Sequence, residues 1–408
     1  MKKNSLDRQF WFFSLGRLLL QFGSGFTLFY SSLYFVNELN FSPTSVGIVL
    51  ASSSITGVLG RFLGGIWSDS AKWGRKKTIL LSALVSAAAD VVFILTNSYL
   101  LLLLGNLLIG LGIGLYWPPA EAIVVDLIPE NKRNFAFALT RFSDNLGLGL
   151  GVAMGGYLIS LTGDYRLLFI INAIFFVIFY LLVKFTIRET YCGVGGVERV
   201  NPWLGWQQAL RDKKLWLFCF ANILFTSYVS QIQSILPLYF ANFVLDEAFS
   251  ITSLSSIFTL HMAFATLWQL PVVKILNRFT PLQGLMLSSV TWAISFLLVW
   301  TTANVKTNAL YWGVTSVILS SLALTLYNPA ASAFIVDLAP VSFRGVYFAI
   351  HSECWAIGYL IGPPLGGWML DLGYNHVHDF WLFLSLTAIP ITFILYILHR
   401  KCSHSANR

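Results

Sequence analysis

The chain has 408 residues, of which 56% are hydrophobic and only 11% are charged. Soluble domains carry roughly 25% charged residues, so this composition excludes an ordinary water-soluble protein. Apolar segments recur along the whole chain, and each is long enough, at about 20 residues, for a helix to cross a bilayer. The net charge of +8 therefore indicates basic loops at a membrane surface rather than nucleic-acid binding.

These segments predict an all-α integral membrane protein with twelve transmembrane helices. A polar stretch separates two sets of six and contains a short segment, Trp203–Arg211, whose tryptophans suit the membrane interface. We expect an N-terminal six-helix bundle at 1–187, a cytoplasmic linker at 188–214, and a C-terminal bundle with a short tail at 215–408. The predicted spans, in chain order, are 10–36, 44–67, 78–97, 99–127, 135–162, 166–187, 215–244, 250–276, 281–303, 308–337, 343–371 and 379–399.

Basic residues sort strongly between the two sides of these spans. With both termini on the cytoplasmic side, and residues near span ends counted with the side they adjoin, 21 of the 26 lysines and arginines fall on the cytoplasmic side, two fall outside and three lie deeper within spans. Cytoplasmic loops carry the excess of basic residues in membrane proteins. The sequence therefore predicts a multi-pass protein of the inner (plasma) membrane with both termini in the cytoplasm.

The two halves of the chain repeat one another. DLIPENKR at 126–133 matches DLAPVSFR at 337–344, and GLGLGVAMGG at 147–156 matches GYLIGPPLGG at 358–367, both 211 residues apart. Several matches in the same order indicate duplication of a six-span unit. Repeated halves with a binding site between them are typical of secondary transporters.

The loop between spans 2 and 3 joins glycines, one acid and several bases in GGIWSDSAKWGRKK, residues 64–77. Asp69 ends span 2, and Arg75 and Lys76 open span 3. A carboxylate there could pair with the bases or with the positive N-terminus of a helix. Such contacts could hold one state of a transporter together, although a basic anchoring loop explains the same residues.

Spans 5 and 11 carry glycines at intervals of four, which form a smooth stripe for close helix packing. In span 11 a proline, which bends a helix by removing a backbone hydrogen bond, stands beside them. The predicted packing residues are Gly147, Gly151, Gly155, Gly156, Gly358, Gly362, Pro363, Gly366 and Gly367.

Through these motifs the chain resembles the major facilitator superfamily, and within it the twelve-span drug:proton antiporters, over essentially its whole length. The family's loop motif resembles residues 65–77, with matching positions at Gly65, Asp69, Gly74, Arg75 and Lys76. Two extra residues separate Asp69 from Gly74, where the family spacing is shorter. The resemblance implies two pseudo-symmetric six-helix bundles that work by alternating access, with spans 1, 4, 7 and 10 around a central cavity.

Two departures from the family pattern bear on proton coupling. In span 5, Val152 stands where the antiporter motif has proline, and the full pattern appears in span 11 instead. In span 4, Asn106 stands where the family has an arginine that it links to proton coupling. Any coupling residue must therefore lie elsewhere.

Ionisable residues inside spans are costly and are functional candidates by default. Arg17, Glu121 and Arg141 lie roughly 10 Å from the cytoplasmic ends of their spans, and Asp144 lies a little deeper, at about 14 Å. Two bases and two acids at similar depth could form a static network or a titrating or substrate-binding cluster. Asp90 in span 3 is isolated, and both a structural and a coupling role stay open.

Asp126 ends span 4 near the loop motif and is expected to join it in stabilising an outward-open state. Cavity-lining residues are expected on spans 1, 4, 7 and 10, although ordinary interhelical packing also explains their polarity. These candidates are Gln21, Tyr30, Asn106, Asn222, Tyr228, Gln231, Tyr327 and Asn328.

Two transport functions and one of another class remain open. The first is a secondary transporter that exports a small amphipathic or apolar organic compound, with proton antiport as one coupling mode. The second is an importer or facilitator of a polar solute, and the third an intramembrane enzyme or channel. The sequence contains no HExxH, GxSxG, CxxC or GxxxxGK[ST] motif, which argues against common hydrolase and ATP-driven chemistry. We expect a monomer that needs no cofactor or metal.

The charge asymmetry makes the topology testable. We expect a C-terminal fusion to a reporter active only in the cytoplasm to be active, because basic loops are retained on that side. A second fusion, to an enzyme active only outside, provides the control. Activity of the second fusion alone would contradict the predicted orientation.

Overall fold

The computed structural model describes residues 8–129, 133–190, 202–244, 249–276, 278–304, 308–340 and 343–406. All regular secondary structure in these ranges is helical. The chain divides into two compact units. The first contains Met1–Phe41 and Ile48–Gly195, and the second contains Ser42–Gly47 and Gly196–Arg408.

The first unit contains the helices that correspond to the first six predicted spans. They are α1 (Arg8–Leu28), α2 (Tyr30–Leu33), the π-helix η1 (Tyr34–Glu38), α3 (Pro43–Ser68), α4 (Gly74–Ile94), α5 (Tyr99–Leu127), α6 (Arg133–Thr162) and α7 (Arg166–Thr186). The first residues of α3 are grouped with the second unit.

The second unit begins with the linker helix and continues through the remaining spans. It contains α8 (Pro202–Arg211), α9 (Lys213–Ser234), α10 (Leu236–Asn242), α11 (Ile251–Leu276), α12 (Pro281–Asn304), α13 (Ala309–Leu338), α14 (Arg344–Asp371) and α15 (Tyr374–Ala406).

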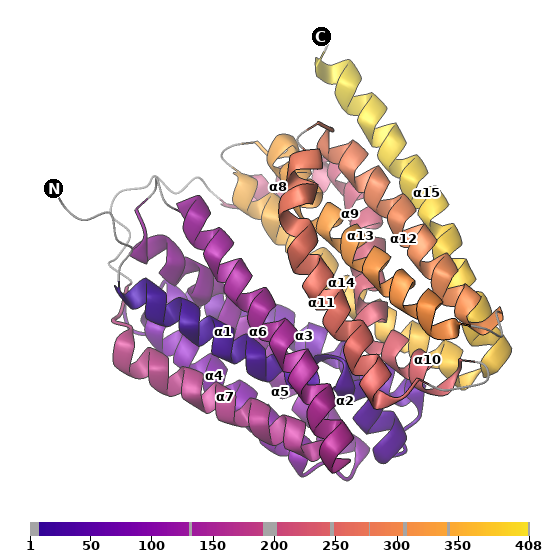
Figure 1. Ribbon diagram of the computed structural model, residues 1–408. Helices are drawn as coiled ribbons and strands as arrows, with labels where there is room; N and C mark the ends of the chain where they lie inside the picture. Colours follow the sequence, from indigo (N-terminus) through magenta and orange to yellow (C-terminus); the bar gives the residue numbers. More distant parts are fainter. Residues whose placement is uncertain are drawn as a thin grey trace. The chain divides into compact units, whose positions relative to one another are not determined.

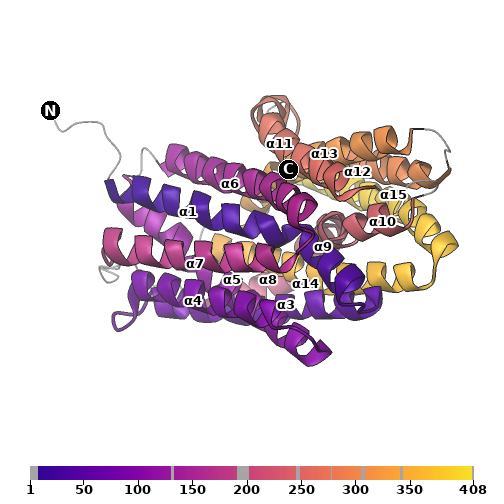
Figure 2. The same cartoon turned by 60° about the horizontal axis from the view of Figure 1, so that its bottom comes forward.

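Each unit pairs its helices in the same pattern. In the first, α1 packs against α6 and α7, and α4 packs against α5 and α7 (Figure 1). In the second, α9 packs against α14 and α15, and α12 packs against α13 and α15 (Figure 2). Corresponding spans therefore make corresponding pairs, which confirms the two pseudo-symmetric bundles expected from the internal repeat.

Ten helices of the described residues are long and apolar enough to cross a membrane. The two other long helices are α1 and α14, the first and eleventh spans, which carry charged residues such as Arg17 and Glu353. Together they supply twelve positions, which fits the expected number of spans.

The first and seventh spans are interrupted, although the sequence predicts each as one helix. The hydroxyls of Ser24 and Thr27 donate to the carbonyls of Leu20 and Ser24 at 3.1 and 3.2 Å, just before α1 ends. Such bonds compete with the helix's own and bend it. In the seventh span, Pro237 lies in the first turn of α10, where it cannot donate a backbone bond to α9.

Glycines bring α6 into backbone contact with α1. A Cβ atom built on Gly151 would lie 2.9 Å from the Cα atom of Gly25 and closer still to the carbonyl of Phe22. Gly147 approaches the carbonyl of Leu18 in the same way. The stripe predicted in span 5 therefore lies in the α1–α6 interface.

The corresponding α9–α14 interface is polar. Gly358 and Gly362 of α14 face Thr226 and Ser230 of α9. Thr226 Oγ1 donates to the carbonyl of Cys354 at 2.9 Å. Hydroxyls of α9 thus fill the spaces that the glycines of α14 leave.

The α1–α6 contact should be sensitive to one methyl group. Gly151→Ala should lower the free energy of unfolding by about 1–3 kcal/mol, because the new Cβ meets backbone that cannot rotate away. Gly65→Ala is the control, since nothing lies within 4 Å of a Cβ there. Thermal unfolding in detergent measures both variants, and equal midpoints would contradict the close approach.

Candidate functional site

A buried ion-pair cluster joins α1, α5 and α6 within the first unit. Arg17 of α1 is 0% exposed, and its Nε and Nη2 atoms donate to Asp144 Oδ1 and Oδ2 of α6 at 3.0 and 2.5 Å. Two parallel bonds between guanidinium and carboxylate are the strongest geometry for such a pair. Arg17 and Asp144 therefore form a bidentate link between the two helices.

Glu121 of α5 is held more loosely in the same cluster. Its Oε1 atom accepts from Arg17 Nη1 and Nη2 at 3.4 Å and lies 3.4 Å from Arg141 Nη2. The side chains of Glu121 and Arg141 are 30% and 51% exposed, against 8% for Asp144. The cluster thus has a buried pair at one end and an accessible pair at the other.

An aromatic side chain separates the two arginines. The ring of Trp117 lies under both guanidinium groups, 5.7 Å from Arg17 and 5.2 Å from Arg141. Trp117 precedes Glu121 by four residues, so one face of α5 presents both the ring and the acid. We did not predict Trp117 from the sequence, although its place one turn before Glu121 was the available signal.

The four charged residues predicted at similar depth are therefore brought together, in a specific pairing. Asp144 binds Arg17 rather than Arg141, and Glu121 is shared between both bases. Two acids and two bases give the cluster no net charge. A proton added to either acid would therefore change the charge of a site that the bilayer keeps at low polarity.

The residues of the loop motif gather at the end of the first unit where α4 begins. Arg75 forms an ion pair with Asp126 of α5 and donates to the carbonyl of Ala122 at 3.1 Å. Asp69 is more distant, with Oδ1 3.8 Å from Arg75 Nη2, and its side chain is 64% exposed. Asp126 thus joins the motif, as expected, and is its main acidic contact here.

A second acid, Glu189, lies at the N-terminus of α4. Its two carboxylate oxygens accept from the backbone N–H groups of Arg75 and Lys76 at 2.9 and 3.1 Å. The positive end of a helix favours such a carboxylate. Gly74 has φ of +74° at this point, and a Cβ atom there would meet Glu189. We did not predict Glu189, because it follows α7 in a segment without helical periodicity.

Several cavity candidates lie in interhelical contacts of their own unit. Tyr30 is fully buried and donates to the carbonyl of Val152 at 2.8 Å. Asn106 Nδ2 donates to the carbonyl of Leu102 in its own helix at 3.0 Å.

In the second unit, Gln231 Nε2 donates to the carbonyl of Gly362 at 2.7 Å. Tyr228 Oη lies 2.5 Å from Thr387 Oγ1. Gln21 is half-buried and Asn328 is exposed.

Three polar side chains of the second unit form a chain. Tyr327 Oη of α13 donates to Asn222 Oδ1 of α9 at 2.5 Å, and Asn222 Nδ2 lies 3.0 Å from His351 Nδ1 of α14. His351 stacks on Phe218. Sequence reasoning identified Asn222 and Tyr327 but did not connect His351 to them.

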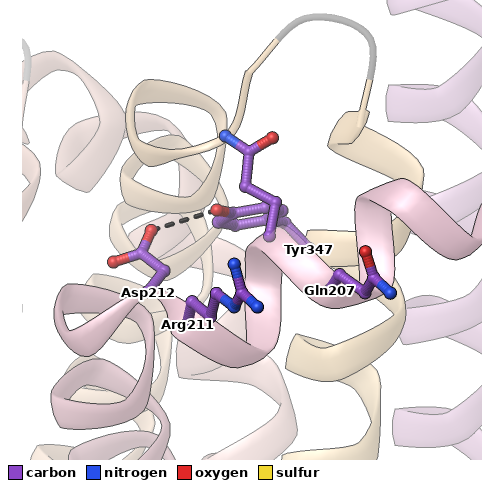
Figure 3. Close-up of a pocket in the computed structure, with 5 residues that line it drawn as sticks. Gln207, Arg211, Asp212 and Tyr347 are labelled. Carbon is purple, nitrogen blue, oxygen red and sulfur yellow. Dashed lines mark hydrogen bonds between the residues drawn. The ribbon is translucent and has the colours of Figure 1, made fainter.

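The linker helix α8 packs against α14, and a hydrogen bond to α14 follows directly after its last residue. Tyr347 donates to Asp212 Oδ2 at 3.0 Å, beside a pocket that Gln207, Gln208 and Arg211 also line (Figure 3). Asp212 Oδ1 also caps α9 by accepting from the N–H of Lys214 at 2.9 Å. On the predicted interfacial segment Leu210 is 55% exposed, whereas Trp203's side chain and residues 191–201 lie outside the described residues.

Two pseudo-symmetric six-helix bundles, the first with a buried ion-pair cluster, are an architecture of secondary transporters. The family model of the Major Facilitator Superfamily matches residues 13–250 and 240–407. The chain therefore belongs to the Major Facilitator Superfamily, and it is a multi-pass membrane transporter rather than an enzyme.

Two curated relatives resemble the chain over most of its length. A Na(+), Li(+), K(+)/H(+) antiporter of Planococcus maritimus is 25% identical over 398 residues, which cover 88% of each chain. The multidrug resistance protein MdtH of Escherichia coli is 26% identical over 362 residues, covering 88% of this chain and 86% of the relative.

Solved structures share the fold at lower identity. The nucleoside transporter NupG superposes with a TM-score of 0.80 at 17% identity, covering 96% of this chain and 100% of NupG in its D323A form. A D-xylose-proton symporter superposes with a TM-score of 0.74 at 16% identity, covering 95% and 96% of the two chains. These likenesses define the fold alone.

The two acids beside Arg75 should behave differently when neutralised. Asp69→Asn should leave the unfolding midpoint nearly unchanged, because an exposed pair at this distance contributes at most about 1 kcal/mol, yet it should slow transport if Asp69 stabilises the outward-open state. Asp126→Asn should lower the free energy of unfolding by about 1.5–3 kcal/mol, because it removes a partner of a charged group. Unfolding midpoints and transport rates are measured for both variants, and unchanged transport in Asp69→Asn would contradict a role of Asp69 in stabilising the outward-open state.

Proposed function

We propose that this transporter exports small amphipathic or apolar organic compounds across the inner membrane in exchange for protons, as a monomer with both termini in the cytoplasm. The observation that carries the proposal is the neutral cluster of Arg17, Glu121, Arg141 and Asp144. It provides an acid that can be titrated without unfolding the bundle, at a depth that protons could reach from one side.

Glu121 is the better proton acceptor of the two acids. Asp144 is 8% exposed and makes two short bonds to Arg17, so protonating it would remove the closer counter-charge of a fully buried cation. That loss typically costs about 3–5 kcal/mol. Glu121 is partly exposed and makes only contacts of 3.4 Å, so a proton can bind there while the Arg17–Asp144 link is kept.

Protonation of Glu121 changes the cluster in a way that can drive a helix movement. It gives the cluster a net charge of +1 and removes the ionic contact between Glu121 and Arg141. Arg141 is half-exposed and retains only the Trp117 ring among its contacts in the described residues. The contacts of α5 with α1 and with α6 would then both weaken while the α1–α6 link persists, so the proton acts on the two helix contacts that run through Glu121.

The names of the curated relatives support export and proton exchange. One is called a cation/H(+) antiporter and the other a multidrug resistance protein. Asn106 still replaces the arginine of the family pattern in span 4, so Arg17 supplies the buried base in this chain.

Uptake or facilitated passage of a polar solute is the second candidate. It is favoured by the Tyr327–Asn222–His351 chain, which offers hydrogen-bonding groups in three helices of the second unit. Polar solutes are selected by such groups, because a ligand that cannot pair with them leaves buried polar atoms unsatisfied.

Proteoliposomes with an imposed pH gradient separate these functions. Wild-type protein should accumulate a lipophilic cationic dye against its gradient only when protons flow the other way. Glu121→Gln should abolish this pH-driven transport and spare dye exchange at equal pH, because the side chain can no longer bind or release a proton.

Glu353→Gln, which removes a half-buried acid of α14, is the matched control and should keep full coupling. Asp144→Asn should also lose coupling, but with a lower unfolding midpoint, since it removes the closer charged partner of the buried Arg17. Full pH-driven transport by Glu121→Gln would make the cluster structural. Transport of a nucleoside or pentose, with no dye transport, would favour the second candidate.

A further inference from the structure

A carboxyl group without a counter-charge is buried on the far side of the first unit from the Arg75 loop. Asp90 of α4 is 1% exposed and Asn172 of α7 is 3% exposed. Asn172 Nδ2 donates to Asp90 Oδ1 at 3.2 Å. In the part of the chain that the structure describes, no lysine, arginine or histidine contacts Asp90. An isolated carboxylate in such surroundings is very costly, and the group normally takes up a proton instead.

The hydrogen bonding of the pair also indicates a missing proton donor. Asp90 Oδ2 and Asn172 Oδ1 are both buried, and neither has a hydrogen-bond partner among the described residues. If Asp90 is ionised, both atoms are acceptors, and neither can satisfy the other. If Asp90 is protonated, it becomes the donor that the amide oxygen lacks, and acid and amide are complementary in both directions. One proton therefore accounts for two unsatisfied atoms.

Position along the helices places this pair near one end of the unit. Asp90 lies four residues before the end of α4 at Ile94, about 6 Å along the axis, and Asn172 lies six residues after the start of α7 at Arg166, about 9 Å. This is the end opposite the Arg75 loop. In the proposed topology it faces the outside of the cell.

Aromatic rings cover the pair toward that end. Phe93 and Phe169 lie three residues from Asp90 and Asn172, one turn nearer the helix ends, and their ring centroids are 5.3 Å apart. Phe35 packs on both, at 5.5 and 6.0 Å. All three are at most 5% exposed. The pair and the rings beside it are therefore buried from solvent in the conformation described.

The third ring of this layer belongs to an unusual helix segment. Phe35 lies in η1, a π-helical segment of five residues. Such segments are rare and are frequently found at functional sites. On the other face, Gly23 of α1 lies against Asn172 and Phe175. Movement of the first span could therefore displace Phe35 and expose the pair.

The other ionisable groups at this end lie above the aromatic layer. Glu38, Asp164 and Arg166 are exposed, and Arg166 Nε donates to Tyr34 Oη at 3.2 Å. Burial, with a further contribution from the charge of Glu38, raises the pKa of Tyr165 to about 12. Tyr165 thus stays neutral at physiological pH. The group whose proton can be exchanged at this end is therefore Asp90, beneath the aromatic layer.

We propose that Asp90 and Asn172 form a second proton-binding site, filled in this conformation and emptied to the outer side when the aromatic layer opens. The bond formed is the Asp90 Oδ2–H bond, and the proton comes from and returns to bulk water. The inference extends the proposed proton coupling, which rests on Glu121, by a separate group near the opposite end of the same unit.

Infrared spectroscopy of the purified protein tests the site without any transport. Wild-type protein at neutral pH should show the carbonyl band of a protonated, hydrogen-bonded carboxyl group that Asp90→Asn lacks. Asn172→Leu should shift this band to higher frequency, because the amide no longer bonds to the acid. Asp164→Asn, which removes an exposed acid at the same end, should leave it unchanged. Identical wild-type and Asp90→Asn spectra, or a band that Asn172→Leu does not move, would overturn the site.

Transport stoichiometry in proteoliposomes then tests whether the proton turns over. The steady-state dye gradient of wild-type protein should rise with the pH gradient more steeply than that of Asp90→Asn, by one proton per dye molecule. Equal slopes would show that the Asp90 proton is not exchanged during transport and that Asp90 is a permanently protonated structural residue. If wild-type protein shows no response to the pH gradient, the proposed coupling fails, while the infrared band still decides whether Asp90 holds a proton.

Discussion

A charged side chain within a bilayer must either meet an opposite charge or lose its own, and the first unit contains both solutions. Arg17 meets two carboxylates, and the resulting links join α1 to α5 and α6. Asp90 meets only an amide and therefore has to be neutral. The same physical constraint thus produces a network that ties helices together and an isolated group whose state depends on a single proton.

Packing determines which helices such groups can move. The α1–α6 contact is made backbone to backbone through Gly25 and Gly151, and the Arg17–Asp144 pair adds two hydrogen bonds to it. Helix α5 contacts the same pair through Glu121. The distance from Glu121 to Arg17 is longer than that from Asp144, and the side chain of Glu121 is partly exposed. A change of protonation would therefore alter the position of α5 before that of α6, since the glycine contact leaves α1 and α6 little freedom to separate.

Much of this arrangement followed from the sequence, because hydropathy and spacing determine depth. The expected fourth span coincides with α5, and residues at equal depth, Glu121 and Arg141, do meet. Depth does not determine which face of a helix points where, so the pairing of Asp144 with Arg17 was not predictable. Glu189 and Trp117 were missed for a related reason: one follows a helix without periodicity, and the other resembles an ordinary interfacial tryptophan.

The two titrating groups of the first unit lie near opposite ends of it. Glu121 is six residues from the end of α5 at Leu127, about 9 Å, whereas Asp90 is about 6 Å from the end of α4 that adjoins the start of α5. A proton that leaves Asp90 makes the unit more negative by one, and a proton that binds Glu121 makes it more positive by one. If both events occur in the same step, the net charge of the unit within the bilayer does not change. Moving net charge through a membrane has an electrostatic cost, and the unit as a whole would then not incur it. Only the local surroundings of η1 and of Arg141 would have to rearrange.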